Sequence, residues 1–210
     1  MAFVDIQSSY DSAAQAYAEH LFGELAQKPL DRHLLHRYAE AIGGRGLVAD
    51  LGCGPGHVSK YLHERGVTMV GIDLSPAMVE CAKRLCPGIE FRAGDMRGLD
   101  LPDGSLAGIV AFYAIVHLTE SALPAVFREW RRLLAPGGLL LLAFHVGDET
   151  VHVEDLWGVR VSLDFHFLPV AGVMKALRTA GFTVLKAVER EPYEGAEYPS
   201  RRSYLLCRAI

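Results

Sequence analysis

Val48-Ala49-Asp50-Leu51-Gly52-Cys53-Gly54-Pro55-Gly56 is the stretch that decides the fold of this chain. It begins as a short apolar strand and passes directly into a glycine-rich turn, and the pattern from His57 to Glu64 predicts a helix. Glycines let the backbone of such a turn approach a polar ligand closely, and the first N–H groups of the helix face that ligand. Asp50, at the end of the strand, lies where open α/β sheets bind their ligands.

The rest of the chain alternates strands with helices. Apolar runs predict strands at 47–51, 67–72, 89–93, 109–114, 139–146, 182–189 and 203–208. Helical spacing predicts helices at 5–22, 30–42, 57–64, 75–85, 121–134 and 170–180. Near-continuous apolar strands separated by helices predict an α/β fold with a mostly parallel sheet covered on both faces. The last two strands have no helix between them and are expected to pair antiparallel.

The length, composition and charge of the chain favour some classes of protein and disfavour others. A chain of 210 residues, 50% hydrophobic and 22% charged, is expected to form one globular domain. Its net charge of −4 disfavours a nucleic acid or an anionic membrane as partner. The four cysteines lack metal-site spacing, no apolar run is long enough to span a membrane, and the first residues lack a secretory pattern. We therefore expect a cytoplasmic monomer or homodimer without a metal.

The spacing of the glycines indicates which ligand the turn holds. A dinucleotide fingerprint, GxGxxG, needs a glycine where this chain has His57, and no Gly-Lys-Ser/Thr follows as in a P-loop. The chain has GxGxG instead, which suits a ligand without phosphates.

Ordered motifs beyond the turn resemble a known family. Asp50-Leu-Gly-Cys-Gly-Pro-Gly56 is followed by Gly71-Ile-Asp-Leu-Ser-Pro-Ala-Met78, Gly94-Asp-Met96 and Leu134-Ala-Pro-Gly-Gly138. This set resembles class I S-adenosylmethionine-dependent methyltransferases of the small-molecule type, in particular methyltransferase domains 11 and 25. The resemblance implies a Rossmann-like, doubly wound seven-stranded sheet of order 3-2-1-4-5-7-6 with one antiparallel strand. It also implies a single domain with an N-terminal helical cap (1–44), a cofactor-binding core (45–146) and a C-terminal helix and strand pair (169–210).

The resemblance further implies which residues hold S-adenosylmethionine. Asp50 helps to hold the ammonium group, Asp73 accepts both ribose hydroxyls, and Asp95 accepts from the adenine amino group. The implied cofactor-binding residues are Tyr17, Asp50, Gly52, Cys53, Gly54, Gly56, Asp73, Leu74, Met78, Asp95, Met96 and Phe112. Other interpretations of single residues stay open: Asp73 can cap the next helix, Asp95 can be a turn residue, Met78 can belong to the core, and Tyr17 can anchor the first helix.

The methyl acceptor is the open question at the sequence level. Tyr113 and His117 follow the fourth strand beside the transferred methyl, so they are the candidate catalytic residues, although either can be part of the pocket wall. Residues 147–168 form a long excursion at the ligand end of the sheet and are expected to be a substrate lid. We expect methyl transfer to an O, N, S or C atom of a small molecule. The alternatives are a non-catalytic adenosylmethionine-binding protein and an RNA methyltransferase.

Overall fold

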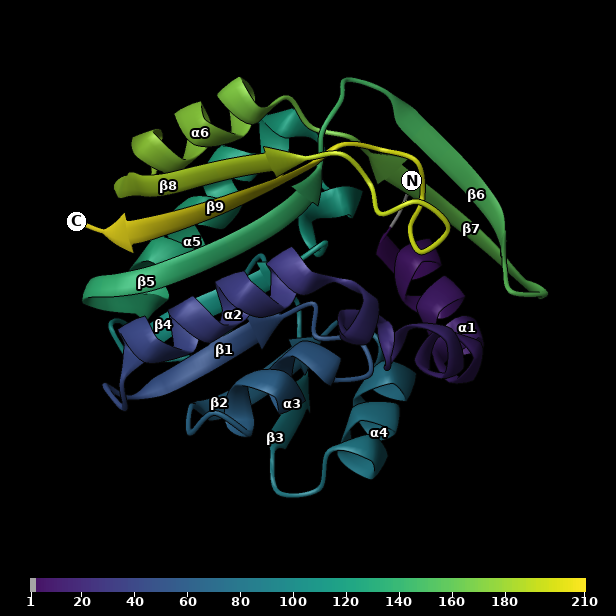
Figure 1. Ribbon diagram of the computed structural model, residues 1–210, viewed down its shortest axis with the longest axis horizontal. Coiled ribbons are helices and arrows are strands. Elements are labelled where there is room, and N and C mark those ends of the chain that lie inside the picture. Colours follow the sequence, from purple (N-terminus) through teal and green to yellow (C-terminus); the bar gives the residue numbers. More distant parts are fainter. Residues whose placement is uncertain (1–2) are drawn as a thin grey trace.

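A mixed sheet runs through the centre of the molecule, with helices on both of its faces (Figure 1). The computed structural model describes the backbone of residues 3–210 and the side chains from Ile6 onward. The sheet has seven strands, in the order β3 (Glu90–Ala93), β2 (Thr68–Asp73), β1 (Leu47–Leu51), β4 (Leu106–Phe112), β5 (Leu134–His145), β9 (Arg202–Ala209) and β8 (Phe182–Arg190). Strands β3 to β5 are parallel, whereas β9 is antiparallel to both of its neighbours. The predicted order 3-2-1-4-5-7-6 is confirmed, since β8 and β9 are the predicted sixth and seventh strands.

The two faces of the sheet are covered by different helices. Helices α2 (Pro29–Ile42) and α3 (His57–His63) bury their apolar residues on one face, and α5 (Leu123–Leu133) and α6 (Val170–Thr179) bury theirs on the other. The remaining helical elements are α1 (Phe3–Leu21), η1 (Glu24–Gln27), α4 (Pro76–Leu85), η2 (Ile115–His117) and η3 (Glu120–Ala122). Burial of these apolar faces is the main source of stability for such a layered fold.

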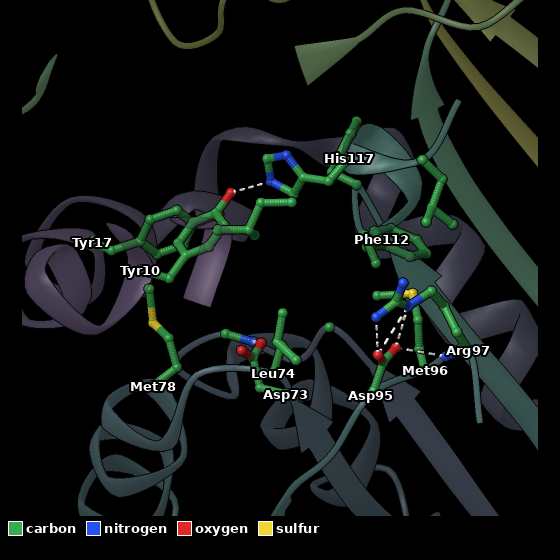
Figure 2. Close-up of a pocket in the computed structure, with 16 residues that line it drawn as sticks. Tyr10, Tyr17, Asp73, Leu74, Met78, Asp95, Met96, Arg97, Phe112 and His117 are labelled. Atoms are coloured by element: carbon green, nitrogen blue, oxygen red, sulfur yellow. Dashed lines mark hydrogen bonds and ion pairs between the residues drawn. The ribbon is translucent and has the colours of Figure 1, made fainter. Parts of the chain in front are cut away.

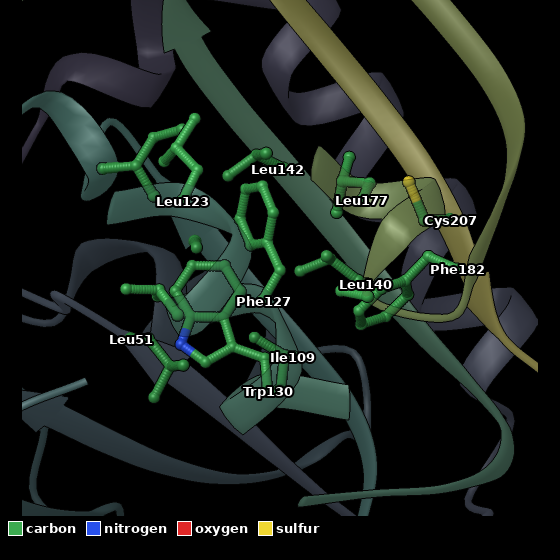
Figure 3. Packing of buried hydrophobic residues seen from close by; sticks show 14 of the residues in the cluster. Leu51, Ile109, Leu123, Phe127, Trp130, Leu140, Leu142, Leu177, Phe182 and Cys207 are labelled. Atoms are coloured by element: carbon green, nitrogen blue, oxygen red, sulfur yellow. The ribbon is translucent and has the colours of Figure 1, made fainter. Parts of the chain in front are cut away.

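The core beneath α5 also supports the ligand end of the sheet. Phe127 and Trp130 are fully buried between the helix and strands β4 and β5 (Figure 3). The indole Nε1 of Trp130 donates a hydrogen bond to the Met96 carbonyl at 2.9 Å. The loop after β3, which carries the Gly94-Asp-Met96 motif, is thereby fixed to the core.

Residues 147–168, expected as a long excursion, contain two strands that were not predicted from the sequence. Strands β6 (Thr150–Leu156) and β7 (Val159–His166) pair antiparallel as a separate two-stranded sheet. Buried Val161 and Leu163 of β7 pack against Ile6 and Ala13 of α1. The excursion is therefore a hairpin, and it lies beside α1 at one end of the molecule (Figure 1).

Most predicted elements are present, with shifted ends. The largest shift is in β5, which begins at Leu134 and not at the expected residue 139, because Leu134 already pairs with Leu106 across an irregularity in the register. Helix α5 begins at Leu123, with a proline in its first turn. Within residues 3–210, no helix is long and apolar enough to cross a membrane.

Candidate functional site

The glycine turn between β1 and α3 is required by both conformation and packing. Gly52, Gly54 and Gly56 have φ values of 70°, 51° and 86°, in the left-handed region that favours glycine. A Cβ on Gly52 would lie 2.6 Å from the Ala114 side chain, and one on Gly56 would lie 2.9 Å from the Phe91 ring. Gly54 is different, because its nearest neighbour across open space is the Tyr17 ring at 3.7 Å. Of the three glycines, Gly54 is thus the one whose missing side chain leaves room for a ligand.

Asp73, the last residue of β2, is held in place by backbone groups on two sides. Its Oδ2 accepts from the Gly54 N–H at 2.8 Å, and its Oδ1 accepts from the Ser75 N–H at 2.9 Å. Burial raises the pKa of this carboxyl above its ordinary value, and the backbone hydrogen bonds oppose that rise. Asp73 therefore links the glycine turn to the start of α4 while its carboxylate lines a pocket.

That pocket collects most of the residues implied by the sequence (Figure 2). The space between its walls is about 720 Å³, a figure that includes open solvent at the mouth. Eleven of the implied residues line it: Tyr17, Gly52, Gly54, Asp73, Leu74, Met78, Asp95, Met96, Phe112, Tyr113 and His117. They come from α1, the ends of β1, β2 and β4, the loop after β3, and α4.

Three other implied residues do not line this pocket. Gly56 and Cys53 face the cluster around Phe91 on the far side of the turn. Asp50 lies beneath the turn, where its Oδ2 accepts from the Ser59 hydroxyl at 2.7 Å. Burial raises the pKa of the Asp50 carboxyl to about 6, although the Ser59 hydrogen bond lowers it in part.

At the other end of the pocket, Asp95 is paired with a residue that sequence reasoning did not select. Arg97 Nε donates to both oxygens of the Asp95 carboxylate at 2.9 Å (Figure 2). Burial raises the pKa of the Asp95 carboxyl, but the hydrogen bonds and charge of Arg97 outweigh this effect and keep the pKa below its ordinary value. Asp95 is therefore a fixed carboxylate at the rim of the pocket.

Helix α1 closes the pocket with Tyr17, which the resemblance implied, and with Tyr10 and Ile6, which it did not. Asp11 Oδ1 accepts from the Ser75 hydroxyl at 2.5 Å and from the Ala77 N–H at 3.1 Å, so it joins α1 to the start of α4. The helical spacing of Tyr10 and Tyr17 is visible in the sequence, but nothing in it indicates which face of the helix meets the pocket.

His117 lies at the top of the pocket with both ring nitrogens hydrogen bonded. Its Nδ1 lies 2.8 Å from the Asp164 carbonyl oxygen, and its Nε2 lies 2.7 Å from the Tyr10 hydroxyl. A carbonyl only accepts, so Nδ1 carries the proton, and Nε2 of the neutral ring accepts from Tyr10. Burial lowers the pKa of His117 to about 4, which makes the neutral ring the form present at pH 7.

Tyr113 directs its hydroxyl away from the space around His117. The hydroxyl lies 3.0 Å from the Tyr204 hydroxyl and donates to Asp31 Oδ1 at 3.4 Å. Asp31 also accepts from Arg190 Nη2 at 3.0 Å, and Arg190 pairs with Glu197. The ring of Tyr113 is therefore pocket wall, and its hydroxyl belongs to a buried polar cluster.

Three histidines of β5, β6 and β7 each have a hydrogen-bond partner within the protein. His145 binds the Ser200 hydroxyl, His166 binds the Thr150 hydroxyl, and His152 binds the Asp164 carboxylate. Among the residues that the structure describes, no group of three or more His, Cys, Asp or Glu side chains could hold a metal ion.

Comparisons with known proteins agree with this architecture. The family model described as "Methyltransferase domain" matches residues 48–138. Over 178 residues the chain is 28% identical to a malonyl-[acyl-carrier protein] O-methyltransferase of Serratia marcescens, covering 83% of this chain and 64% of that protein. Over 150 residues it is 31% identical to phosphoethanolamine N-methyltransferase 3 of Arabidopsis thaliana, covering 68% of this chain and 30% of that protein. The chain thus spans less than two thirds of the length of these relatives.

A solved structure supports the fold independently. The structure aligns with that of an S-adenosylmethionine-dependent methyltransferase of Methanosarcina mazei with a TM-score of 0.70 at 17% identity, covering 78% of this chain and 92% of the other. At this identity the likeness shows the fold alone.

The residues present also fit the cofactor that such proteins use. The half-buried Asp73 carboxylate suits a pair of hydroxyls, Leu74 and Met78 offer apolar surface for a flat ring, and Gly54 leaves space for the ligand. This chain belongs to the class I S-adenosylmethionine-dependent methyltransferases, and S-adenosylmethionine is the cofactor of its site.

Proposed function

We propose that the protein transfers a methyl group from S-adenosylmethionine to an O, N, S or C atom of a small molecule. The observation that carries this proposal is the anchoring of Asp73 by the Gly54 and Ser75 N–H groups inside the pocket. A carboxylate fixed in this way is ready to accept from the two ribose hydroxyls without reorganisation.

In this proposal the adenine lies between the apolar side chains and the loop after β3. Leu74 and Met78 cover one of its faces, Asp95 accepts from its amino group, and the Met96 N–H donates to its ring. The Trp130 hydrogen bond to the Met96 carbonyl supports this role, because it holds the loop against the core. Phe112 completes the wall.

The amino-acid end of the cofactor is assigned to the glycine turn and α1. Gly52 and Gly54 give backbone contact, with Cys53 and Gly56 shaping the turn, and Tyr17 approaches from α1. Asp50 acts from beneath the turn, and its buried carboxylate favours a nearby ammonium group.

For methyl transfer, the protein mainly has to align the acceptor with the cofactor. The sulfonium of the cofactor makes its methyl carbon a strong electrophile, so the residues of the site align the acceptor and exclude water. A base is needed only for an acceptor that loses its proton early. We assign that role to His117, which takes up the proton at Nε2 by way of the Tyr10 hydroxyl that donates to it, with the Tyr113 ring as pocket wall beside it.

A small acceptor is favoured by the relatives and by the charge. The two relatives are named for an O-acceptor and an N-acceptor, and the net charge of −4 does not attract RNA. We further propose that residues 1–44 act as the cap, 45–146 as the cofactor-binding core, 147–168 as the substrate lid and 169–210 as the C-terminal helix and strand pair.

Calorimetry followed by an acceptor screen tests the proposal. We expect S-adenosylmethionine and S-adenosylhomocysteine to bind to the full chain, and absence of binding by both at millimolar concentration would refute it. Methyl transfer is then measured with a panel that includes malonyl thioesters and phosphoethanolamine. Binding without transfer to any acceptor class would favour the non-catalytic alternative.

A further inference from the structure

Helix α1 crosses the mouth of the pocket and is attached on both sides. On one side, Asp11 binds Ser75 and Ala77 at the start of α4. On the other side, the Ser162 N–H of β7 donates to the Ser9 hydroxyl at 3.1 Å. Between these attachments, Tyr10 spans the pocket to reach His117 at 2.7 Å (Figure 2).

The Tyr10–His117 contact differs from the other attachments because its acceptor is an imidazole, the side chain whose ordinary pKa lies between pH 5 and 8. We propose that Tyr10 and His117 form an acid-sensitive latch, in which Tyr10 is the positioning residue that holds α1 over the cofactor. The latch depends on the proposed function only for the identity of the molecule that α1 holds in the pocket. The closing and opening of α1 are properties of the chain itself.

Burial makes the latch sensitive to acid. With α1 closed, the imidazole is enclosed by the Tyr10 ring and by Phe165, whose ring centroids lie 5.4 Å and 4.9 Å away. A protonated ring in this place loses hydration, which is why the pKa of His117 lies near 4. If α1 moves away, the ring meets water and its pKa returns to about 6.5. Protonation therefore favours the open form.

The groups around the imidazole do not cancel this effect. From β7, the Asp164 carbonyl and carboxylate favour the charged ring and the nearby His166 disfavours it, but burial outweighs these contributions, and the carboxylate is engaged by His152. Arg97, which lines the adjoining hollow together with His117, is a cation paired with Asp95. From β5, the titratable side chain is His145, which stacks on Phe167. From α1, Tyr10 stays neutral because burial raises its pKa well above the ordinary value.

The size of the effect follows from the two pKa values. At pH 8 the ring is neutral in both forms, whereas at pH 5 it is mostly protonated in the open form alone. The ratio of open to closed protein then rises about 30-fold between pH 8 and pH 5. Cofactor or product held beneath α1 is released more readily in acid.

Hydrogen exchange of the α1 amides around Tyr10 and Tyr17 measures this opening directly on the full chain without ligand. After correction for the intrinsic exchange rate, we expect protection to fall about 30-fold from pH 8 to pH 5. His117→Gln keeps an acceptor for Tyr10 without titrating, so its protection should not depend on pH. Tyr10→Phe should lower protection several-fold already at pH 8, since it leaves Nε2 without a donor. The matched control His166→Gln should retain the fall. An equal fall in wild type and His117→Gln would overturn the latch.

Calorimetry with S-adenosylhomocysteine separates this proposal from the proposed function. Loss of affinity toward pH 5 in wild type but not in His117→Gln supports the latch. Binding that is equally pH-dependent in both proteins refutes the latch and leaves the function intact. Absence of binding in wild type at pH 8 refutes the proposed function, while the exchange experiment still decides about the latch.

Discussion

Some side chains of this site have a structural role as well as a proposed role in binding the ligand. Asp73 accepts from the Gly54 and Ser75 N–H groups, so the residue that is proposed to bind the ribose also joins β2 to two turns. Ser75 in turn caps α4 by accepting from the Met78 N–H. The two interpretations of Asp73 that the sequence leaves open, helix cap and ligand residue, are compatible in one carboxylate.

Asp73→Ala is expected to weaken S-adenosylhomocysteine binding by about 1–3 kcal/mol, the scale of losing charge-assisted hydrogen bonds. Asp73→Asn keeps the shape but not the charge, and should lose a smaller part of that affinity. Calorimetry gives both values. The exposed Asp100→Ala serves as control. Unchanged affinity in Asp73→Ala would disprove the assigned role.

Asp50 is the residue whose charge opposes folding. Its pKa is raised by burial from an unfolded value near 3.9 to about 6. For an acid with a raised pKa, the folded form binds the proton more tightly. The contribution of Asp50 to the free energy of unfolding is therefore fully present below pH 4. It declines as the pH rises from about 4 through 6 and is lost above pH 6.

Asp50→Asn should thus raise the free energy of unfolding at pH 8 by about 2–3 kcal/mol and change it little at pH 4. Asn can still accept from the Ser59 hydroxyl. Urea unfolding at the two pH values measures the difference. A gain of equal size at both would mean that the charge of Asp50 is not the cause. If Asp50 holds the ammonium group, the same variant should also bind the cofactor more weakly.

At the scale of elements, the β6–β7 hairpin and α1 form a cover that is separate from the main sheet. Trp157, at the turn of the hairpin, stacks on His20 at 4.8 Å and meets the edge of Tyr17 at 5.6 Å, both distances being between ring centroids. Its side chain stays partly exposed, with 39% of its surface open to solvent. The hairpin therefore positions α1 and adds little to the main core.

Trp157→Ala is expected to weaken S-adenosylhomocysteine binding several-fold with only a small loss of unfolding free energy, about 1 kcal/mol or less. Binding is measured by calorimetry and stability by urea unfolding. Leu185→Ala, at an exposed apolar position on β8 away from α1, is the matched control for binding. A loss of stability as large as that of a core substitution, with no change in affinity, would contradict this assignment.

At the scale of the whole molecule, a buried ion cluster joins the N-terminal cap to the C-terminal strands. Arg190, at the end of β8, donates to Asp31 of α2 and to Glu197 of the loop before β9. The side chains of Asp31 and Glu197 are 0% and 1% exposed. Buried charges are tolerated only when paired, so removing Arg190 leaves the Asp31 carboxylate without its cation, whereas Glu197 keeps Lys28 and Arg202.

Arg190→Met should lower the free energy of unfolding by about 3–5 kcal/mol. Arg201→Met, which breaks exposed ion pairs with Glu189 and Glu191, should lower it by about 0–1 kcal/mol. Urea unfolding of the two variants gives the comparison. Similar small losses in both would show that the cluster contributes no more than surface pairs do.

The sequence predicted the main fold well because its information is local. Apolar strand runs, the Ser75-Pro76 helix start and the positive-φ glycines each act within a few residues. The hairpin at 150–166 was not predicted, because the strand predictions rested on continuous apolar runs, whereas β7 alternates Val159, Val161 and Leu163 with polar residues and is half exposed. The start of β5 was predicted five residues too late, because Leu134 is held in the sheet by Leu106, a distant partner.

The sequence by itself determined the glycine turn, which depends on local conformation. Through the family resemblance of its motif residues, whose chemistry is fixed by type, it also indicated the order of the sheet and the identity of the cofactor. Only the tertiary structure decided which atoms are available. It engaged the Nε2 of His117 with Tyr10, turned the Tyr113 hydroxyl toward Asp31, and paired Asp95 with Arg97. The physical reason is that hydrogen-bond partners and burial come from segments far apart in the chain, and burial sets the protonation state.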